Sequence, residues 1–251
     1  MQSCRFLFAC VAGAALLCAQ APTAPVISAR GVTNFFTQEP APGTVGLGGL
    51  VQISGLNLGP PEGIKATDLP WPAKLGDTTV VIGGKAAALY SVSPGTILAQ
   101  VPVDSNVGLV NVTVRRGSVS SAPAKVTVAA LAPSVRAADD SGAGVPWGKI
   151  TAQTIAITAS GLGPTEPKLA SGEAGPADTP AMPTAPIDAY VGGLRAKVTA
   201  AASTTRPAEF DITITVPDGA RRGDLITLFA GHQAANPTVF EIGRASCRER
   251  V

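Results

Sequence analysis

The sequence predicts an all-β protein built from two antiparallel β-sandwiches in tandem, on three observations. The chain holds 28 Gly and 22 Pro among 251 residues, which indicates many turns and few long helices. Short β-branched or alternating runs recur between Gly, Pro, Ser and Asn. No window carries an apolar stripe of helical spacing bounded by caps. We therefore expect strands throughout the body of the chain.

The first half of the body supplies the clearest strand signals. Residues 51–54 alternate apolar and polar side chains and then meet the turn sequence GLNLGPP. The β-branched run 79–82 ends at the hairpin signal Gly83-Gly84. Further strands are expected at 97–101, 109–114 and 125–128. Strands this short, separated by turn residues, are typical of antiparallel sandwiches.

The second half repeats the first in three places and in the same order. The matched segments are VQISGLNLGPPE (51–62) with IAITASGLGPTE (155–166), TTVVIGGKAAAL (78–89) with IDAYVGGLRAKV (187–198), and AQVPVDSNVGLVNVTV (99–114) with ITVPDGARRGDLITLF (214–229). Three matches in order predict two copies of one unit that meet near residues 131–135.

The expected domain boundaries follow this repeat. Within the second copy, residues 168–186 are rich in Ala, Pro and Gly and carry no periodic apolar face, which predicts an extended or mobile loop. The predicted segments are a signal peptide (1–19), a linker (20–30), a first sandwich (31–131), a second sandwich (132–241) with a long loop (166–186), and an artefactual tail (242–251).

The first residues are typical of an export signal. Arg5 precedes the apolar run 6–18, which has the length of a signal-peptide core and is short for a bilayer span. We expect cleavage after Ala19. The alternative is lipidation at Cys18, which Leu17 disfavours because such sites carry a small residue there. The export signal predicts that the mature chain lies outside the cell or on its surface. No other segment is apolar enough to span a membrane.

Cysteine and charge limit the chemistry of the body. The four cysteines, Cys4, Cys10, Cys18 and Cys247, all lie outside residues 20–241. The body therefore offers no disulfide, no thiolate metal site and no cysteine nucleophile. It carries 15 basic and 16 acidic residues, and the net positive charge of the whole chain comes from the two ends. This balance predicts no nucleic-acid partner.

The last ten residues differ in composition from the body. IGRASCRERV (242–251) concentrates three arginines and a cysteine after a sequence in which charges are sparse. It resembles the translation of a common short-read sequencing adapter. We therefore leave these residues out of every argument about fold and charge.

The order of the motifs resembles a known family. The stretch LYSVSPGTILAQVP (89–102), between ISGLNLGP and SSAPAKVTVAA, is similar to the uncharacterised C-terminal domain of secreted proteins of soil acidobacteria (Solibacter-type). The halves of that domain are similar to IPT/TIG-type immunoglobulin-like domains. The resemblance covers about residues 30–241 and implies two immunoglobulin-like units with no assigned activity. The second copy departs from it at TAAASTTRPAEF (199–210).

Side chains for catalysis or metal binding are sparse. His232 is the only histidine, and no G-x-S-x-G elbow accompanies it. Asp139 and Asp140 are the one adjacent carboxylate pair, which is too few oxygen ligands for calcium. We interpret them as a loop histidine and a solvated turn. The sequence therefore predicts no enzyme, no cofactor, and no catalytic, cofactor-binding or metal site.

Trp71 and Trp147 are the candidate residues for ligand or partner contact. Both lie in Pro-flanked loop sequences, LPWPAK and VPWGK. An exposed tryptophan stacks on a sugar ring or anchors a protein partner, whereas a buried one fastens its loop to the sandwich. We favour the packing role. Because aromatic residues make up only 4% of the chain, we do not expect a broad carbohydrate platform.

The expected function is a non-catalytic binding, adhesion or structural role outside the cell, by analogy with the fold. The expected partner is an extracellular protein or a carbohydrate. Two alternatives stay open: a substrate-binding accessory part of a secreted hydrolase, and a fragment of a larger multidomain extracellular protein.

Overall fold

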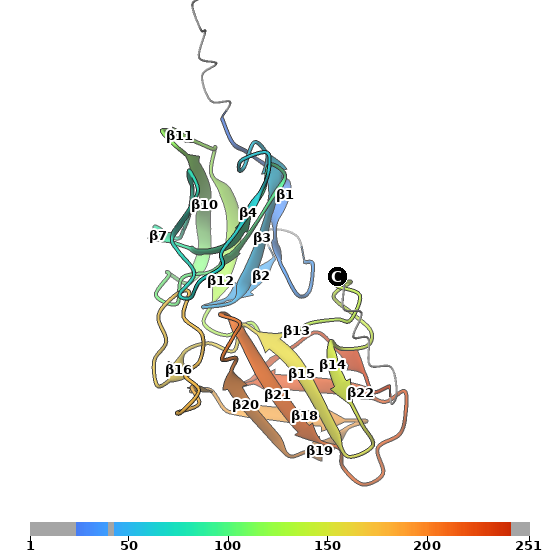
Figure 1. Cartoon of the computed structure of the whole chain (residues 1–251). Helices are drawn as coiled ribbons and strands as arrows, with labels where there is room; N and C mark the ends of the chain where they lie inside the picture. The colour runs from blue at the N-terminus through green and yellow to red at the C-terminus, as the bar shows by residue number, and fades with distance from the viewer. Residues whose placement is uncertain (1–23, 40–42, 242–251) are drawn as a thin grey trace, which may run out of the picture.

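The computed structural model describes residues 24–39 and 43–241, and every regular element within them is a β-strand (Figure 1). The predicted all-β class is confirmed. The predicted signal peptide, with its cleavage after Ala19 and the alternative at Cys18, and the tail 242–251 lie outside the described residues. In the part of the chain that is described, no helix is long and apolar enough to cross a membrane.

The first sandwich consists of two sheets. Its strands are β1 (Val26–Asn34), β2 (Thr44–Gly46), β3 (Leu50–Leu56), β4 (Ile64–Lys65), β5 (Lys74–Leu75), β6 (Thr78–Ile82), β7 (Lys85–Ala86), β8 (Ala88–Val92), β9 (Thr96–Gln100), β10 (Gly108–Arg116), β11 (Val119–Ser120) and β12 (Ala124–Ala129). One sheet has the order β1-β3-β9-β8-β4 and the other β2-β12-β10-β6-β5, with β11 beside β10 and β7 beside β6. Strand β2 pairs with β12 in parallel, and the other pairs are antiparallel.

Alternating side chains build the core of this sandwich. In β6, Val80 and Ile82 are fully buried, whereas Thr79 and Val81 face outward. Valines, isoleucines and leucines from both sheets form one continuous cluster. Each such side chain contributes about 1.5–3 kcal/mol when it is fully buried. The strands predicted from alternation thus form because one face of each sheet is apolar.

The second sandwich also has two main sheets. Its strands are β13 (Ser134–Val135), β14 (Gly148–Ile150), β15 (Thr154–Ser160), β16 (Thr165–Glu166), β17 (Met182–Pro183), β18 (Ile187–Val191), β19 (Leu194–Ala196), β20 (Val198–Ala202), β21 (Glu209–Thr215), β22 (Leu225–Ala230), β23 (Gln233–Ala234) and β24 (Thr238–Val239). The sheets have the orders β13-β15-β21-β20, with β14 beside β15, and β19-β18-β22-β23, with β24 beside β22. A second apolar cluster lies between them.

Each copy contains a hairpin of the same kind, closed by two glycines. Gly83 and Gly84 connect β6 to β7, and Gly192 and Gly193 connect β18 to β19. All four glycines have φ between 59° and 84°, which a two-residue hairpin turn requires and other residues rarely adopt. The strand before each turn pairs with a later strand of the same sheet, β6 with β10 and β18 with β22.

The loop between β16 and β17 reaches the first sandwich. The Ser171 hydroxyl accepts a hydrogen bond from the Val103 amide at 3.1 Å. The Gly172 amide donates to the Gln100 side chain at 2.5 Å, and its carbonyl accepts from the Trp71 amide at 2.9 Å. The sequence predicted an extended or mobile loop here. The structure instead holds the loop tip against the first sandwich through these three bonds.

The two sandwiches also meet directly. Figure 1 shows the second sandwich below the first, with the loop from β16 running up beside their junction. The Leu50 amide donates to the Ser160 hydroxyl at 3.3 Å, and that hydroxyl donates to the Ala208 carbonyl at 2.7 Å. Both residues that carry the bond across the junction, Leu50 and Ser160, are buried. The sandwiches are therefore joined by packing as well as by the chain between them.

Candidate binding groove between the sandwiches

Trp71 lies at the junction of the two sandwiches. It belongs to an apolar cluster with Phe36, Leu50 and Ala88 of the first sandwich and Ala208 of the second. Only 9% of its surface is exposed. Its ring packs on Tyr90 with centroids 5.0 Å apart and planes tilted by 42°. Trp71 thus fills the junction and also fastens the loop tip through its backbone amide.

A groove of about 430 Å³ opens beside this cluster, and we call it the seam groove. Its volume lies within the range of ordinary ligand sites, which often occur between domains. Its walls come from both sandwiches: Phe35, Leu50, Ala66, Thr67, Asp68, Leu69, Trp71, Tyr90 and Leu98 from the first, and Arg136, Thr204, Thr205, Arg206 and Glu209 from the second. Aromatic rings therefore form one side of the groove, and hydroxyl and guanidinium groups form the other.

Trp147 does not line the groove but supports a residue that does. The Arg136 guanidinium carbon lies 4.7 Å from the centroid of the Trp147 ring and 6.0 Å from that of Phe35. Its Nε also pairs with Asp140 at 3.0 Å. A cation over an aromatic ring contributes about 0.5–1 kcal/mol at an exposed site. Trp147 thus supports Arg136, which lines the same groove as Trp71.

The acidic end of the groove is a salt-bridge network. Arg206 contacts Glu209 through Nε and Asp211 through Nη2, each at 2.6 Å. Burial raises the pKa of Glu209, and the positive charges of Arg206 and Arg136 oppose that rise. A buried carboxylate held by a guanidinium is suited to orient Arg206 toward the groove. This arrangement gives the groove fixed polar groups beside its rings.

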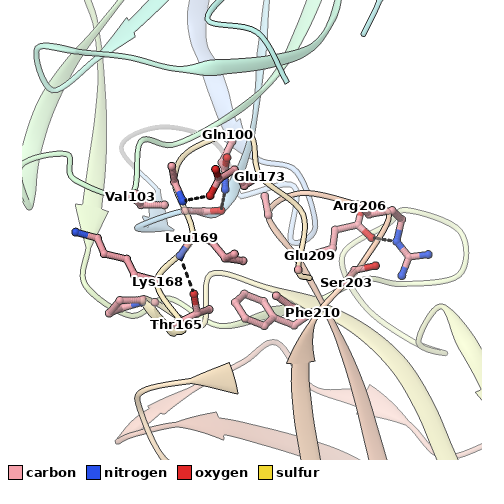
Figure 2. A pocket seen from close by; sticks show the side chains of 17 residues that line it. Gln100, Val103, Thr165, Lys168, Leu169, Glu173, Ser203, Arg206, Glu209 and Phe210 are labelled. Atoms are coloured by element: carbon pink, nitrogen blue, oxygen red, sulfur yellow. Dashed lines mark hydrogen bonds and ion pairs between the residues drawn. The ribbon is translucent and has the colours of Figure 1, made fainter. Parts of the chain in front are cut away.

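A second, smaller cavity lies where the loop packs on the junction (Figure 2). Its volume is about 50 Å³, enough for a few waters at about 10–15 Å³ each but too small for a ligand. Figure 2 shows Gln100 reaching the loop backbone and Thr165 holding Leu169. Glu173 accepts from the Ala170 amide at 2.6 Å. The loop therefore closes this side of the junction.

The remaining titratable candidates lie away from the groove walls. His232 is exposed in the hairpin between β22 and β23. Asp139 and Asp140 are exposed as well, and hydrogen bonds from Ser141 lower the pKa of Asp139. Among the described residues, no group of three or more His, Cys, Asp or Glu side chains is placed to hold a metal ion.

Sequence reasoning missed most of the groove. Tyr90 lies in the stretch LYSVSPG, the most specific part of the family resemblance, and that signal could have identified it. Arg206 and Glu209 lie in residues 199–210, where the second copy departs from the resemblance, and that departure was their one signal. No local pattern identified Arg136. The role of these three residues depends on the packing of one sandwich against the other.

The first sandwich matches a known domain family. The IPT/TIG domain family matches residues 34–128. No curated protein matches the chain significantly. Similar solved structures include the surface glycan-binding protein PbSGBP-B from Prevotella bryantii, at 14% identity and a TM-score of 0.29, with 84% of this chain and 41% of that chain covered. They also include domains 5–6 of the S-layer protein SbsC, at 12% identity and a TM-score of 0.27, with 88% and 99% covered.

A third similar structure is the I9–I11 tandem of titin, at 9% identity and a TM-score of 0.24, with 87% of this chain and 65% of that chain covered. The chain spans less than half the length of the glycan-binding protein that it matches. The family match runs from the end of β1 into β12, and so covers the first sandwich apart from most of β1. Residues 34–128 therefore match the IPT/TIG domain family, and the fold of this part of the chain is immunoglobulin-like.

Proposed function

We propose that the protein is a non-catalytic binding protein that acts outside the cell and holds its partner in the seam groove. The observation that carries this proposal is the groove itself. It joins the rings of Trp71 and Tyr90 to the guanidinium groups of Arg136 and Arg206 across two docked sandwiches. Aromatic surfaces with a few fixed polar groups are the usual lining of a binding site.

The chemistry of the groove supports binding over catalysis. Glu209 lies 2.6 Å from Arg206, so its carboxyl group positions that guanidinium. Arg206 is further fixed by Asp211. General acid–base catalysis needs a group that exchanges protons with a substrate near the working pH. A carboxylate that is paired in this way is better suited to positioning a guanidinium.

The setting of this function rests on the sequence. The apolar segment before Ala19 predicts export, so the proposed location is the cell surface or the extracellular space. The proposed domains are 31–131 and 132–241. The proposed partner is an extracellular protein or a carbohydrate, because the half-buried ring of Tyr90 and the guanidinium groups beside it suit both.

A variant that fills the seam groove with a longer side chain tests this proposal. The purified protein is applied to a glycan array and to a pull-down from secreted and surface-extracted proteins. Thr205→Arg places a long side chain at the exposed rim of the groove, and Thr215→Arg makes the same change at an exposed position on β21. We expect Thr205→Arg to abolish the retained partner and Thr215→Arg to keep it. Equal binding by both variants would refute the seam groove as the site.

A further inference from the structure

Two aromatic rings stand on the outer face of the second sandwich. In β18, Ala189 and Val191 are buried in the core, so Tyr190 points to the opposite side. In β22 the same alternation turns Phe229 outward. The centroids of the two rings lie 5.9 Å apart, and their planes meet at 86°. One ring thus presents its edge to the face of the other.

The first sandwich serves as an internal reference for this face. The repeat places Val81 of β6 where β18 has Tyr190. Val81 pairs with Thr113, just as Tyr190 pairs with Thr227. Arg115 lies two residues after Thr113, and Phe229 lies two residues after Thr227. Arg115 is therefore the counterpart of Phe229 in the first copy. The fold is therefore built without rings at these positions in the first copy. In a chain with only 4% aromatic residues, the pair in the second copy calls for a separate reason.

Polar groups border the rings closely. Arg195 of β19 lies opposite Tyr190 in the register, and its Nη2 pairs with Asp188 at 2.7 Å. Asp188 in turn lies opposite Phe229. The two charges neutralise each other, while the remaining donors of the guanidinium and acceptors of the carboxylate stay available. The hydroxyl of Thr227 adds a further donor and acceptor beside Tyr190.

The face is an open depression that follows the strands. It is lined by Asp188, Tyr190, Gly192, Gly193, Leu225, Thr227, Phe229, Gly231 and His232. One end is the Gly192-Gly193 hairpin, where a Cβ on Gly193 would meet nothing within 4 Å. The other end is the hairpin of Gly231 and His232. Five residues of β18 span about 16 Å at 3.3 Å each.

We propose that this face binds an internal stretch of a linear, uncharged polysaccharide. Because the two rings are nearly perpendicular, one of them offers its face to a pyranose ring and the other offers its edge. The pyranose hydroxyls meet Asp188, Arg195 and Thr227. Because the glycines of the Gly192-Gly193 hairpin carry no side chains, the polysaccharide can extend past this end of the depression. An apolar protein interface fits less well, because Asp188 lines the depression and pairs with Arg195 beside the rings, and acidic residues are depleted from the core of such an interface. The site is separate from the seam groove and does not rest on the function proposed above.

Affinity gel electrophoresis of the purified protein tests the proposal. The probes are three soluble neutral polysaccharides, hydroxyethylcellulose, galactomannan and arabinoxylan, with polygalacturonate as the charged comparison. We expect at least one neutral polymer to retard the protein. Tyr190→Ala and Phe229→Ala should weaken that binding about tenfold or more by titration calorimetry. Val81→Ala and Arg115→Ala, the matched changes in the first copy, should leave it unchanged.

Further variants distinguish ring stacking from a loss of folding and from binding in the seam groove. Tyr190→Leu keeps apolar volume without a ring, and it replaces Tyr190→Ala should that variant unfold. Thr205→Arg should bind the neutral polymer as well as the unaltered protein does. The proposal is overturned if no neutral polymer retards the protein, if polygalacturonate alone does, or if the ring variants bind normally. It is also overturned if these variants only dissolve a dimer seen by light scattering.

Discussion

Gly46 and Gly161 face each other across the junction of the two sandwiches at a separation that excludes any side chain. A Cβ on Gly46 would lie 2.8 Å from both the Cα and the carbonyl oxygen of Gly161. Gly161 also accepts a hydrogen bond from the Ala132 amide at 3.1 Å, in the segment that connects the copies. Backbone therefore packs on backbone where the two units meet.

Gly46→Ala tests this contact. The backbone of Gly46 is not in the left-handed region, so the substitution acts through overlap with Gly161 and not through φ strain. We expect a loss of about 1–3 kcal/mol in the free energy of unfolding, measured by urea denaturation. Gly95→Ala is the matched control, because its Cβ would approach nothing closer than 4.0 Å. Similar losses in both variants would contradict a specific contact at the junction.

The contact between Gln100 and the loop predicts a second effect. The Gln100 side chain accepts from the Gly172 amide and donates to the Gly48 carbonyl at 3.0 Å, and it is 4% exposed. Gln100→Ala leaves both backbone groups without this partner, which costs about 1–3 kcal/mol. The loop 168–186 should then be cleaved faster in limited proteolysis. Gln153→Ala, at an exposed turn, should change neither quantity.

Glu209 predicts a pH dependence. Burial raises the pKa of Glu209 in the folded protein, in opposition to the charges of Arg206 and Arg136. The folded state then keeps this proton to a higher pH than the unfolded state does. The contribution of Glu209 to stability is therefore complete at acidic pH and is lost as pH rises through the folded pKa.

The glutamine side chain of the Glu209→Gln variant does not lose a proton as the pH rises. Relative to the unaltered protein, the free energy of unfolding of this variant should rise between about pH 4 and about pH 7, measured by urea denaturation at each pH. A relative fall over the same interval would show that the ion pair with Arg206 outweighs burial.

The Arg136–Trp147 contact predicts a measurable coupling. A double-mutant cycle of Arg136→Ala and Trp147→Leu should give an interaction free energy of about 0.5–1 kcal/mol. The same cycle with Arg195→Ala in place of Arg136→Ala should give a value near zero, because Arg195 pairs with Asp188 instead. Equal couplings in the two cycles would contradict a specific stack.

Sequence patterns predicted the strands because their causes are local. Alternation over 51–54 and the glycine pair at 83–84 indicate which side chains turn inward and where the chain reverses. The packing role favoured for Trp71 also matches its position in the junction. Tryptophan is a large, highly buried residue on average.

The junction was not predictable in this way. Its bonds connect residues far apart in the chain, such as Leu50 with Ser160 and Gln100 with Gly172. Residues 168–186 are rich in small residues, and this composition is typical of an unstructured linker. Small residues also allow one backbone to pack closely on another, so the composition alone does not distinguish the two cases. The paired rings of Tyr190 and Phe229 emerge only from the register of β18 with β22. Each aromatic residue alone is an ordinary strand residue.

The loop tip at Ser171 and Gly172 attaches the second unit to the first at a point separate from the connector and from the junction at Leu50 and Ser160. Contacts at separate points restrict the relative orientation of two units more than a connector alone does. The proposed partner in the seam groove and the proposed polymer along β18 would then be held in a defined relation to each other. A segment with the composition of a flexible spacer thus helps to fix how the two units are arranged.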